Sequence, residues 1–384
     1  MAVAVALAGA LLCLLAMAGC GFCVHAGTAV GRYRPGPGPP PAREPDVSLL
    51  KPLYGDEPGL AASLRSFLAQ DYGGAVEMRL GVQRPDDPVL PLARRLAAEH
   101  AGVTVVADSA AHGTNAKVSN LVNLQAAAPL AALVVQSDSD IAVRRGYLRG
   151  LAAALADERV GLATCLYLGA PAREGLAARL GAMFVSYSGF PLFAVGVALG
   201  ATPAMGSTLA MRRETLEAIG GFAAVKDVLA DDYEVGAKVR ALGLQTVVPP
   251  MLVTHLSTES TLAELWRHEV RWSRTVADID LAGHLGSVVT HALPLALIGA
   301  ALLRFSPPGL AILALALAAR LWLKSRVDAV ARADGAPAAT GPWWLLPLRD
   351  ILSFAVFLGA LFTRRVDWRG ARFHVARDGG LTPV

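Results

Sequence analysis

The stretch VVQSDSDIAV, residues 134–143, bears on both the fold and the chemistry of this protein. An apolar run ends abruptly in Asp138 and Asp140, which are separated by one residue. Alternate side chains of an extended segment point to the same side, so both carboxylates can face one point just beyond the end of a strand. Two oxygen ligands on one face suit Mg²⁺ or Mn²⁺ that also binds water or phosphate oxygens. The alternative is a solvated loop, because an Asp-x-Asp pair is common by chance.

The sequence from residue 46 to about 276 predicts that this strand belongs to a sheet. Short apolar runs (VSLLKPL, EMRLGVQ, VTVVAD, AALVVQSD and VGLATCLY) alternate with helical patterns such as EPGLAASLRSFLAQ. Continuous apolar strands between amphipathic helices are typical of a mostly parallel sheet that is covered on both faces. The expected fold class is therefore α/β, of the nucleotide-binding type, with its ligand site at the carboxyl ends of the strands.

The composition indicates that part of the chain contacts lipid. The 384 residues are 54% hydrophobic, which is too apolar for a purely soluble protein of this length. The formal net charge is only +4, and no run of Lys and Arg is interleaved with aromatic residues. Nucleic acid is therefore excluded as an expected partner.

The first apolar segment, residues 2–26, is long enough to cross the hydrocarbon core of a bilayer. It lacks the basic start of a secretory signal, so we expect an uncleaved anchor, with cleavage near Ala26 as the alternative. The following RYRPGPGPPPAREP is a Pro/Gly-rich linker that carries Arg32, Arg34 and Arg43. Its positive charge predicts that the chain after the anchor lies in the cytoplasm.

Four further apolar segments predict membrane contact. Residues 288–303 and 310–323 are candidate spans. Residues 343–362 contain Arg349 and Asp350 and have arginine-rich flanks on both sides, which favours a re-entrant or interfacial element. Residues 181–201 are interrupted by Gly, Ser and Pro191, so we expect a segment that dips into the membrane surface.

Two further acidic pairs are candidates for the site. Asp231 and Asp232 open a predicted helix in LADDYEVGAKVRALG, where they are either an ordinary N-terminal cap or a general base beside an acceptor hydroxyl. Asp86 and Asp87 lie between two prolines in GVQRPDDPVL. They are either a turn or a nucleotide contact.

A basic, aromatic helix, ELWRHEVRWSR, precedes the C-terminal apolar segments. Its composition is typical of a helix at a membrane interface. A second interpretation is that Arg271 neutralises a departing diphosphate while Trp272 shapes the acceptor site. The two interpretations are compatible.

These motifs in this order resemble inverting glycosyltransferases of the processive type with a GT-A fold, and more closely the ceramide glucosyltransferase branch. The matching text is KPLYGDEPGL, GVQRPDDP, NAKVSNL, SDSDI, GSTLAMRRETLEAIGGF, LADDYEVG and RHEVRW, over roughly residues 46–280. Within the branch the sequence is most similar to hopanoid-associated glycosyltransferases. It departs from the branch at His268, where the motif usually begins with Gln or Arg.

The resemblance implies a role for each matching residue. Asp232 is expected to be the catalytic base, with Asp231 as the alternative. Asp138 is expected to contact ribose and, with Asp140, to bind the cation. The other implied donor-binding residues are Pro52, Leu53, Asp56 or Glu57, Asp86, Asp87, Lys117, Gly206, Ser207 and Thr208.

The resemblance also implies the reaction and its partners. We expect transfer of N-acetylglucosamine from its UDP donor to bacteriohopanetetrol in a bacterial cytoplasmic membrane, with glucosyl transfer to ceramide as the alternative and a non-catalytic scaffold as a remote one. The predicted domains are a transmembrane anchor (1–27), a linker (28–45), a cytoplasmic GT-A catalytic domain with a mixed, mostly parallel sheet (46–280), transmembrane and interfacial helices (281–363) and a cytoplasmic tail (364–384).

Overall fold

A computed structural model describes residues 1–33, 43–363, 365–368, 371–375 and 381–383 of the chain. Residues 34–42 of the predicted linker, which include Arg34, lie outside these residues. The chain divides into two compact units. One unit comprises residues 1–34, 168–199 and 259–370, and the other comprises residues 35–167, 200–258 and 371–384. We call them the helical unit and the α/β unit.

The α/β unit is built on a seven-stranded sheet in the order β3-β2-β1-β4-β8-β6-β9. The pairs β1–β2, β1–β4, β2–β3 and β6–β9 are parallel, whereas β8 runs antiparallel to β4 and β6. The strands are β1 (Val47–Leu53), β2 (Val76–Val82), β3 (Val103–Ala107), β4 (Leu133–Gln136), β6 (Val160–Ala163), β8 (Leu209–Arg212) and β9 (Gln245–Val247). The mixed, mostly parallel sheet that the sequence predicted is confirmed.

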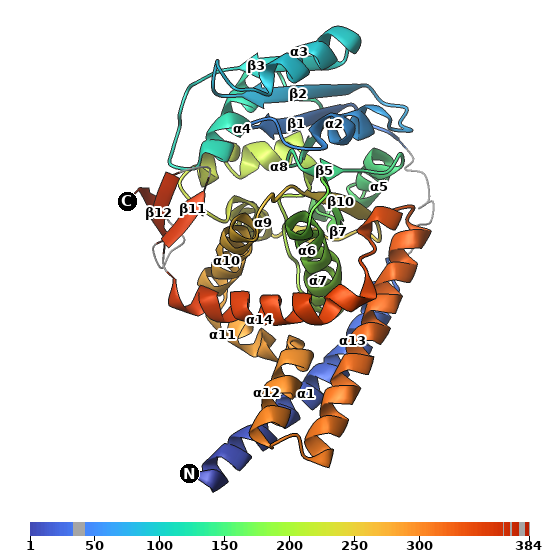
Figure 1. Cartoon of the computed structure of the whole chain (residues 1–384). Coiled ribbons are helices and arrows are strands. Elements are labelled where there is room, and N and C mark those ends of the chain that lie inside the picture. The colour runs from blue at the N-terminus through green and yellow to red at the C-terminus, as the bar shows by residue number, and fades with distance from the viewer. Residues whose placement is uncertain (34–42, 364, 369–370, 376–380, 384) are drawn as a thin grey trace. The chain divides into compact units, whose positions relative to one another are not determined.

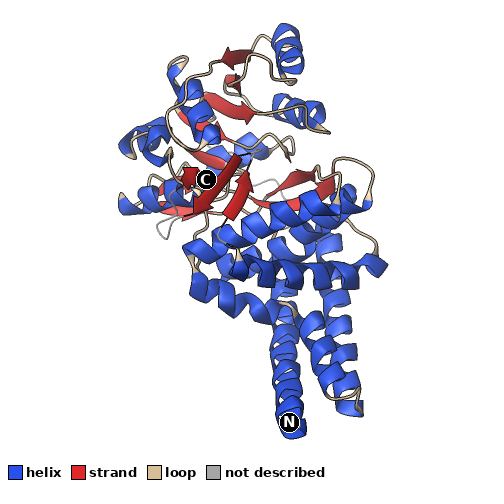
Figure 2. Cartoon of the chain, turned by 60° about the vertical axis from the view of Figure 1, so that its left-hand side comes forward, coloured by secondary structure: helices blue, strands red, loops and turns tan. Residues whose placement is uncertain are grey.

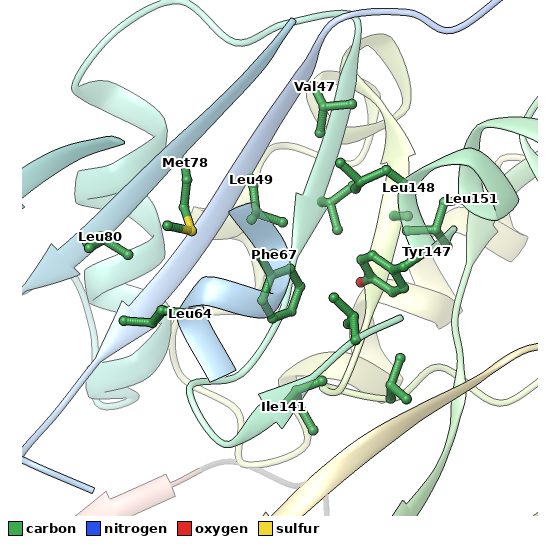
Figure 3. Packing of buried hydrophobic residues seen from close by; sticks show 14 of the residues in the cluster. Val47, Leu49, Leu64, Phe67, Met78, Leu80, Ile141, Tyr147, Leu148 and Leu151 are labelled. Carbon is green, nitrogen blue, oxygen red and sulfur yellow. The ribbon is translucent and has the colours of Figure 1, made fainter. Parts of the chain in front are cut away.

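Helices cover both faces of this sheet because its strands are apolar on both sides. Alternate residues of β1 enter different cores: Val47 and Leu49 pack with one set of helices, and Leu50 packs with the other. Figure 3 shows the first core, in which Phe67 lies between the strands and Tyr147. Its helices are α2 (Leu60–Leu68), α3 (Leu90–Glu99) and α5 (Tyr147–Ala154), and those of the second core are α4 (Ala116–Ala126), α8 (Arg213–Ala218) and α9 (Asp231–Ala241).

Two smaller strand pairs complete the α/β unit. β5 (Ile141–Ala142) and β10 (Leu252–Ser257) are antiparallel, with His255 opposite Ile141. β12 (Ala371–Val375) and β13 (Leu381–Pro383) also pair antiparallel. The predicted tail (364–384) therefore contains regular structure, and β11 (Arg365–Trp368) also lies within it.

The helical unit contains a bundle of three helices that lie side by side (Figures 1 and 2). Close approach depends on small residues. A Cβ atom at Gly19 would lie 2.3 Å from the carbonyl oxygen of Val289, and one at Gly27 would lie 2.2 Å from the ring of Trp322. The bundle helices are α1 (Ala2–Val30), α12 (Ala292–Leu302) and α13 (Pro307–Ala333).

The other helices of this unit are apolar or amphipathic. The segment α6 (Leu176–Phe184), a π-helical turn (Val185–Gly189) and α7 (Phe190–Ala198) are continuous, and β7 (Leu166–Pro171) precedes them. After the α/β unit follow α10 (Leu262–Ile279) and α11 (Leu281–Gly286), and after the bundle follows α14 (Leu346–Phe362).

Three helical segments among the described residues are long and apolar enough to cross a membrane, namely Ala2–Val30, Leu176–Ala198 and Pro337–Phe362. A fourth arises if Leu281–Thr290 and Ala292–Leu302, which meet at a bend of 68°, form one span. The expected span 288–303 is therefore broken near His291. Pro294 favours this break, because it has no amide hydrogen to donate to the preceding turn. These segments indicate a membrane protein.

The charges inside the apolar segment 343–362 are paired within the helical unit. The guanidinium of Arg349, on α14, donates two hydrogen bonds of 2.7 Å to the carboxylate of Glu269 on α10. Asp350 accepts bonds of 2.8 and 2.7 Å from Arg320 on α13. All four side chains are buried. Because each charge has a bidentate partner, the helix can bury them at tolerable cost.

The structure groups the chain differently from the predicted domain boundaries. Residues 168–199 and 259–280, expected within the catalytic domain, belong to the helical unit. The reason is packing: Phe190 on α7 lies edge-on to Tyr33, with ring centroids 5.5 Å apart, and the hydroxyl of Tyr187 donates a 2.6 Å hydrogen bond to Asp328 on α13.

We predict that Arg349→Leu lowers the stability of the detergent-solubilised protein by about 3–5 kcal/mol, because Glu269 is left buried without its cation. The double variant Arg349→Leu/Glu269→Leu should be more stable than Arg349→Leu alone. Thermal unfolding measures both, and Arg267→Leu, at an exposed position of α10, is the control. Equal stability of Arg349→Leu and Arg267→Leu would contradict the prediction.

Candidate active site

Lys117 lies among three carboxylates at the carboxyl-terminal end of the central strands. Its ammonium group is 2.8 Å from Oδ1 of Asp138, which follows β4, and 3.2 Å from Oδ2 of Asp231, which opens α9. Burial lowers the pKa of Lys117, but the charges of Asp138, Asp231 and Asp232 exceed this effect, so the net shift is upward. Lys117 is therefore a permanent cation at neutral pH.

The two neighbouring aspartates at the start of α9 have different environments. Asp231 is buried, and Nδ2 of Asn115 lies 3.5 Å from its Oδ1 in addition to the ion pair with Lys117. Asp232 is half-buried and accepts hydrogen bonds from the amides of Gly206 (2.8 Å) and Tyr233 (2.7 Å). Burial and the charge of Asp231 raise the pKa of Asp232 to about 6, although Lys117 acts in the opposite direction. Asp232 therefore titrates closer to neutral pH than an ordinary aspartate does.

Gly206 joins the two acidic segments. Its amide binds Asp232, and its carbonyl accepts a 3.3 Å hydrogen bond from the amide of Asp138. A Cβ atom at this position would lie 2.7 Å from Oδ2 of Asp138 and 3.1 Å from the ammonium of Lys117. Any larger side chain would therefore displace the carboxylate from the lysine.

The turn that carries Asp138 and Asp140 is held by side chains of β1 and α2. The ammonium of Lys51, fully buried on β1, donates to the carbonyl of Asp138 and lies 3.3 Å from the hydroxyl of Ser137. Ser63 Oγ donates to the carbonyls of Ser139 and Ile141. Burial lowers the pKa of Lys51 to about 7, although the charges of Asp138, Asp140 and Glu57 act in the opposite direction. The main chain of the turn is therefore fixed by buried groups.

Asp140 lies beside a histidine of β10. Its Oδ2 lies 3.1 Å from Nε2 of His255, a buried residue, and its carbonyl accepts a 2.8 Å hydrogen bond from the amide of Leu256. The sequence gives no local sign that links His255 to this site. The structure instead brings it to one of the two predicted metal ligands, because β5 and β10 pair directly after the acidic turn.

Several predicted donor-binding residues contact the protein itself. Asp87 is buried and accepts hydrogen bonds from the amides of Gly55 (2.9 Å) and Val89 (3.0 Å), whereas Asp86 is exposed and paired with Arg84.

The other predicted donor-binding residues differ in exposure and in their partners. Pro52 and Leu53 are buried in β1, while Asp56 is exposed. Glu57 accepts a 2.8 Å bond from Ser139. The hydroxyl of Ser207 donates to the carbonyl of Cys165, and that of Thr208 lies 2.9 Å from the hydroxyl of Tyr147.

The remaining motif, RHEVRW, lies on α10 of the helical unit. His268 Nδ1 is 2.5 Å from Oε1 of Glu259, and its ring centroid is 4.1 Å from that of Trp272. Trp272 also stacks with Phe184 at 6.3 Å. Arg271 is half-buried. The departure at His268 is thus accommodated by an acidic and an aromatic neighbour.

Sequence reasoning missed Lys51 and His255. A lysine in the middle of the mostly apolar strand VSLLKPL is unusual, because a charge is rarely buried, and that was a usable signal. His255 had none, since its proximity to Asp140 depends on the pairing of strands more than a hundred residues apart.

The oxygen ligands that this site offers fit a hard divalent cation. Asp138 and Asp140 offer carboxylate oxygens on one pinned turn, and the nearby Asp231 and Asp232 add negative charge that Lys117 does not fully offset. Among the described residues no group of three or more His, Cys, Asp and Glu side chains has the arrangement of a complete metal site. A cation here would therefore complete its coordination with water or substrate oxygens, as Mg²⁺ commonly does.

Comparison with known proteins identifies the family. The sequence profile described as glycosyl transferase family 21 matches residues 9–381. The chain belongs to this family. The expectation of a glycosyltransferase related to ceramide glucosyltransferases is confirmed at this level, whereas the association with hopanoids stays a prediction.

Two relatives of this family 21 chain come from Caenorhabditis elegans. Ceramide glucosyltransferase 1 is 25% identical over 231 residues, which are 59% of this chain and 49% of that protein. Ceramide glucosyltransferase 3 is 23% identical over 350 residues, or 88% of this chain and 74% of that protein. The first match thus spans about half the length of its relative.

A solved structure with the same fold is a mannosyltransferase from Pyrobaculum calidifontis in complex with GDP-Man and Mn²⁺. It is 21% identical, the TM-score is 0.53, and the alignment covers 92% of this chain and 99% of the other. This likeness confirms the expected GT-A fold.

We predict that Lys117→Met raises the pKa of Asp232 above its value of about 6, because the cation that lowers it is lost. NMR titration of the labelled aspartate carboxyl groups measures this shift. The control is Lys238→Met. Lys238 lies on the same helix as Asp232, α9, but is paired with Glu234 at 3.8 Å, so its loss should leave the pKa of Asp232 unchanged. A pKa of Asp232 that is unchanged in Lys117→Met would show that the two groups do not interact as described.

Proposed function

We propose that this chain transfers a sugar from a nucleotide-diphosphate sugar to a hydroxyl group of a membrane lipid, with inversion at the anomeric carbon. The observation that carries the proposal is Asp232, a carboxylate of raised pKa beside the Lys117 cluster at the carboxyl ends of the strands. Membership of family 21 and the membrane-length helices support it.

In this mechanism Asp232 is the general base. It takes the proton of the acceptor hydroxyl as the oxygen attacks the anomeric carbon, and a single displacement inverts that carbon. A pKa of about 6 leaves Asp232 ionised at neutral pH, yet basic enough to accept the proton as the new bond forms. Asp231 is the less suitable base, because its carboxylate is buried and paired with Lys117.

The turn at Asp138 and Asp140 is proposed to hold the cation and the donor diphosphate. A bound Mg²⁺ or Mn²⁺ would neutralise the diphosphate and so stabilise the departing nucleotide. Lys51 and Ser63 keep the turn in place, and His255 lies beside Asp140. Asp138 is also proposed to contact the ribose.

The other roles are proposed from the motif resemblance. The strand end at Pro52 and Leu53, the acids Glu57, Asp86 and Asp87, and Lys117, Gly206 and Ser207 are proposed to bind the donor. Within this set the exposed carboxylate of Asp86 is better placed for a ligand than that of Asp87, which binds two main-chain amides. Arg271 is proposed to neutralise the leaving diphosphate and Trp272 to shape the acceptor site.

Two acceptors are proposed. The relatives are named ceramide glucosyltransferases, which favours ceramide with UDP-glucose as donor. The segments WRHEVRW and GSVVTH resemble hopanoid-associated glycosyltransferases, which favours bacteriohopanetetrol as acceptor with UDP-N-acetylglucosamine as donor. In the second case the catalytic domain is proposed to face the cytoplasm of a bacterium. Both reactions use the same base and cation.

The deciding experiment incubates membranes containing the protein with each labelled donor and each lipid acceptor. We expect transfer to one lipid with Mg²⁺ or Mn²⁺ present and loss of transfer with a chelator. Asp140→Ala should bind the UDP-sugar equally weakly with and without the cation, whereas Asp157→Ala, an exposed acid, should behave as the unchanged protein. Transfer to neither lipid would refute the acceptors, and chelator-resistant transfer would refute the cation.

A second prediction concerns the base. Asp232→Asn should lower kcat by roughly 10²–10⁴-fold while UDP binding survives, since the amide cannot accept the proton. In the unchanged protein kcat/KM should rise with pH through about 6, because the base acts only when deprotonated. Steady-state kinetics between pH 5 and 8 measure both, and Asp231→Asn is the companion variant. Turnover retained in Asp232→Asn would assign the base elsewhere.

A further inference from the structure

Helix α14 buries its charges and exposes its apolar residues, which is the reverse of a helix that faces water. All three of its polar side chains, Arg349, Asp350 and Ser353, are buried. The large exposed side chains are all hydrophobic: Leu348 (46%), Ile351 (45%), Leu358 (39%) and Phe362 (88%). The outward face of this helix therefore requires an apolar environment.

These residues form one stripe. Together with Trp344, which lies in the short 3-10 turn just before α14 and is 60% exposed, they are spaced by three, four or seven residues. This spacing places them on a single face of a helix. We call Trp344, Leu348, Ile351, Leu358 and Phe362 the outer stripe.

The opposite face of α14 fixes which way the outer stripe points. Arg349 binds Glu269 on α10 and the carbonyl of Leu180 on α6, at 2.7 and 3.2 Å, while Asp350 binds Arg320 on α13. Because these contacts belong to one unit and bury both charges, α14 cannot rotate to face its stripe inward without exposing unpaired charges to an apolar medium.

The direction of α14 and the basic residues that flank it argue against a membrane span. Figures 1 and 2 show it lying across the end of the α1, α12 and α13 bundle, of which α1 is a candidate span. Its 17 residues extend on the order of 26 Å, at the lower limit for a span, so its length does not decide between a span and an interfacial helix. Arginine-rich sequence flanks it on both sides, at 320–332 and 364–372. Two basic flanks are expected on the same side of a membrane.

We propose that α14 lies in the plane of the membrane interface and buries its outer stripe in the acyl region of one leaflet. Lipid is the occupant because the stripe belongs to the same unit as the exposed apolar residues of α1, including Leu7, Leu11 and Leu14. Trp343 and Trp344 mark the start of the helix, and tryptophan prefers the headgroup level. This proposal is independent of the reaction that the chain catalyses.

The test is site-directed spin labelling of the full chain in lipid nanodiscs. Single cysteines replace each stripe residue in turn, and the unsubstituted chain, whose Cys13, Cys20, Cys23 and Cys165 are buried, is the labelling blank. Power saturation compares collisions with oxygen, which partitions into lipid, against collisions with a water-soluble nickel chelate. Leu242→Cys, at an exposed apolar position (45%) of the α/β unit, is the control.

We expect oxygen to be the stronger relaxant at all five stripe positions, at one similar depth of about 5–10 Å below the headgroups. The nickel chelate should be the stronger relaxant at Leu242→Cys. A depth that passes through the bilayer centre along α14 would make it a span and overturn the proposal. Low accessibility to both relaxants would mean that a second copy covers the outer stripe. Access to the nickel chelate would mean that the outer stripe faces water. Either result also overturns the proposal.

Discussion

The candidate active site depends on one buried ammonium group. Lys117 stands at the start of α4 and binds Asp138 after β4 and Asp231 at the start of α9, so that it holds two segments nearly a hundred residues apart. Without it, several carboxylates would repel one another at the carboxyl ends of the strands. With it, Asp138 and Asp231 share one cation, while the amides of Gly206 and Tyr233 hold Asp232 beside them.

Buried charges are also paired in the helical unit, where the ion pairs hold helices together. Arg349 and Arg320 each find a bidentate carboxylate partner, and these pairs attach α14 to α10 and α13. A single unpaired charge in such surroundings would cost several kcal/mol. The result is a helix that is charged where it meets protein and apolar where it does not.

How much of the fold and of the site could be predicted depended on how far apart in the sequence the interacting residues lie. The strands around VSLLKPL and AALVVQSD and the helix at LADDYEVG were predictable, because local periodicity and length determine them. The division into units was not. Residues 168–199 read as part of the catalytic domain, yet contacts such as that of Tyr187 with Asp328 join them to the helical unit. Periodicity carries no information on such distant partners.

The sequence by itself determined the α/β class, the N-terminal membrane-length helix and the residue types of the site, since Asp138, Asp140, Asp231 and Asp232 lie in recognisable local contexts. Only the tertiary structure decided which of these acids is buried and that the pKa of Asp232 is raised to about 6, and it alone brought Lys51 and His255 to the acidic turn. The reason is physical: the pKa of a carboxylate depends on burial and on charges within a few ångströms, and both are fixed by strand pairing and helix packing.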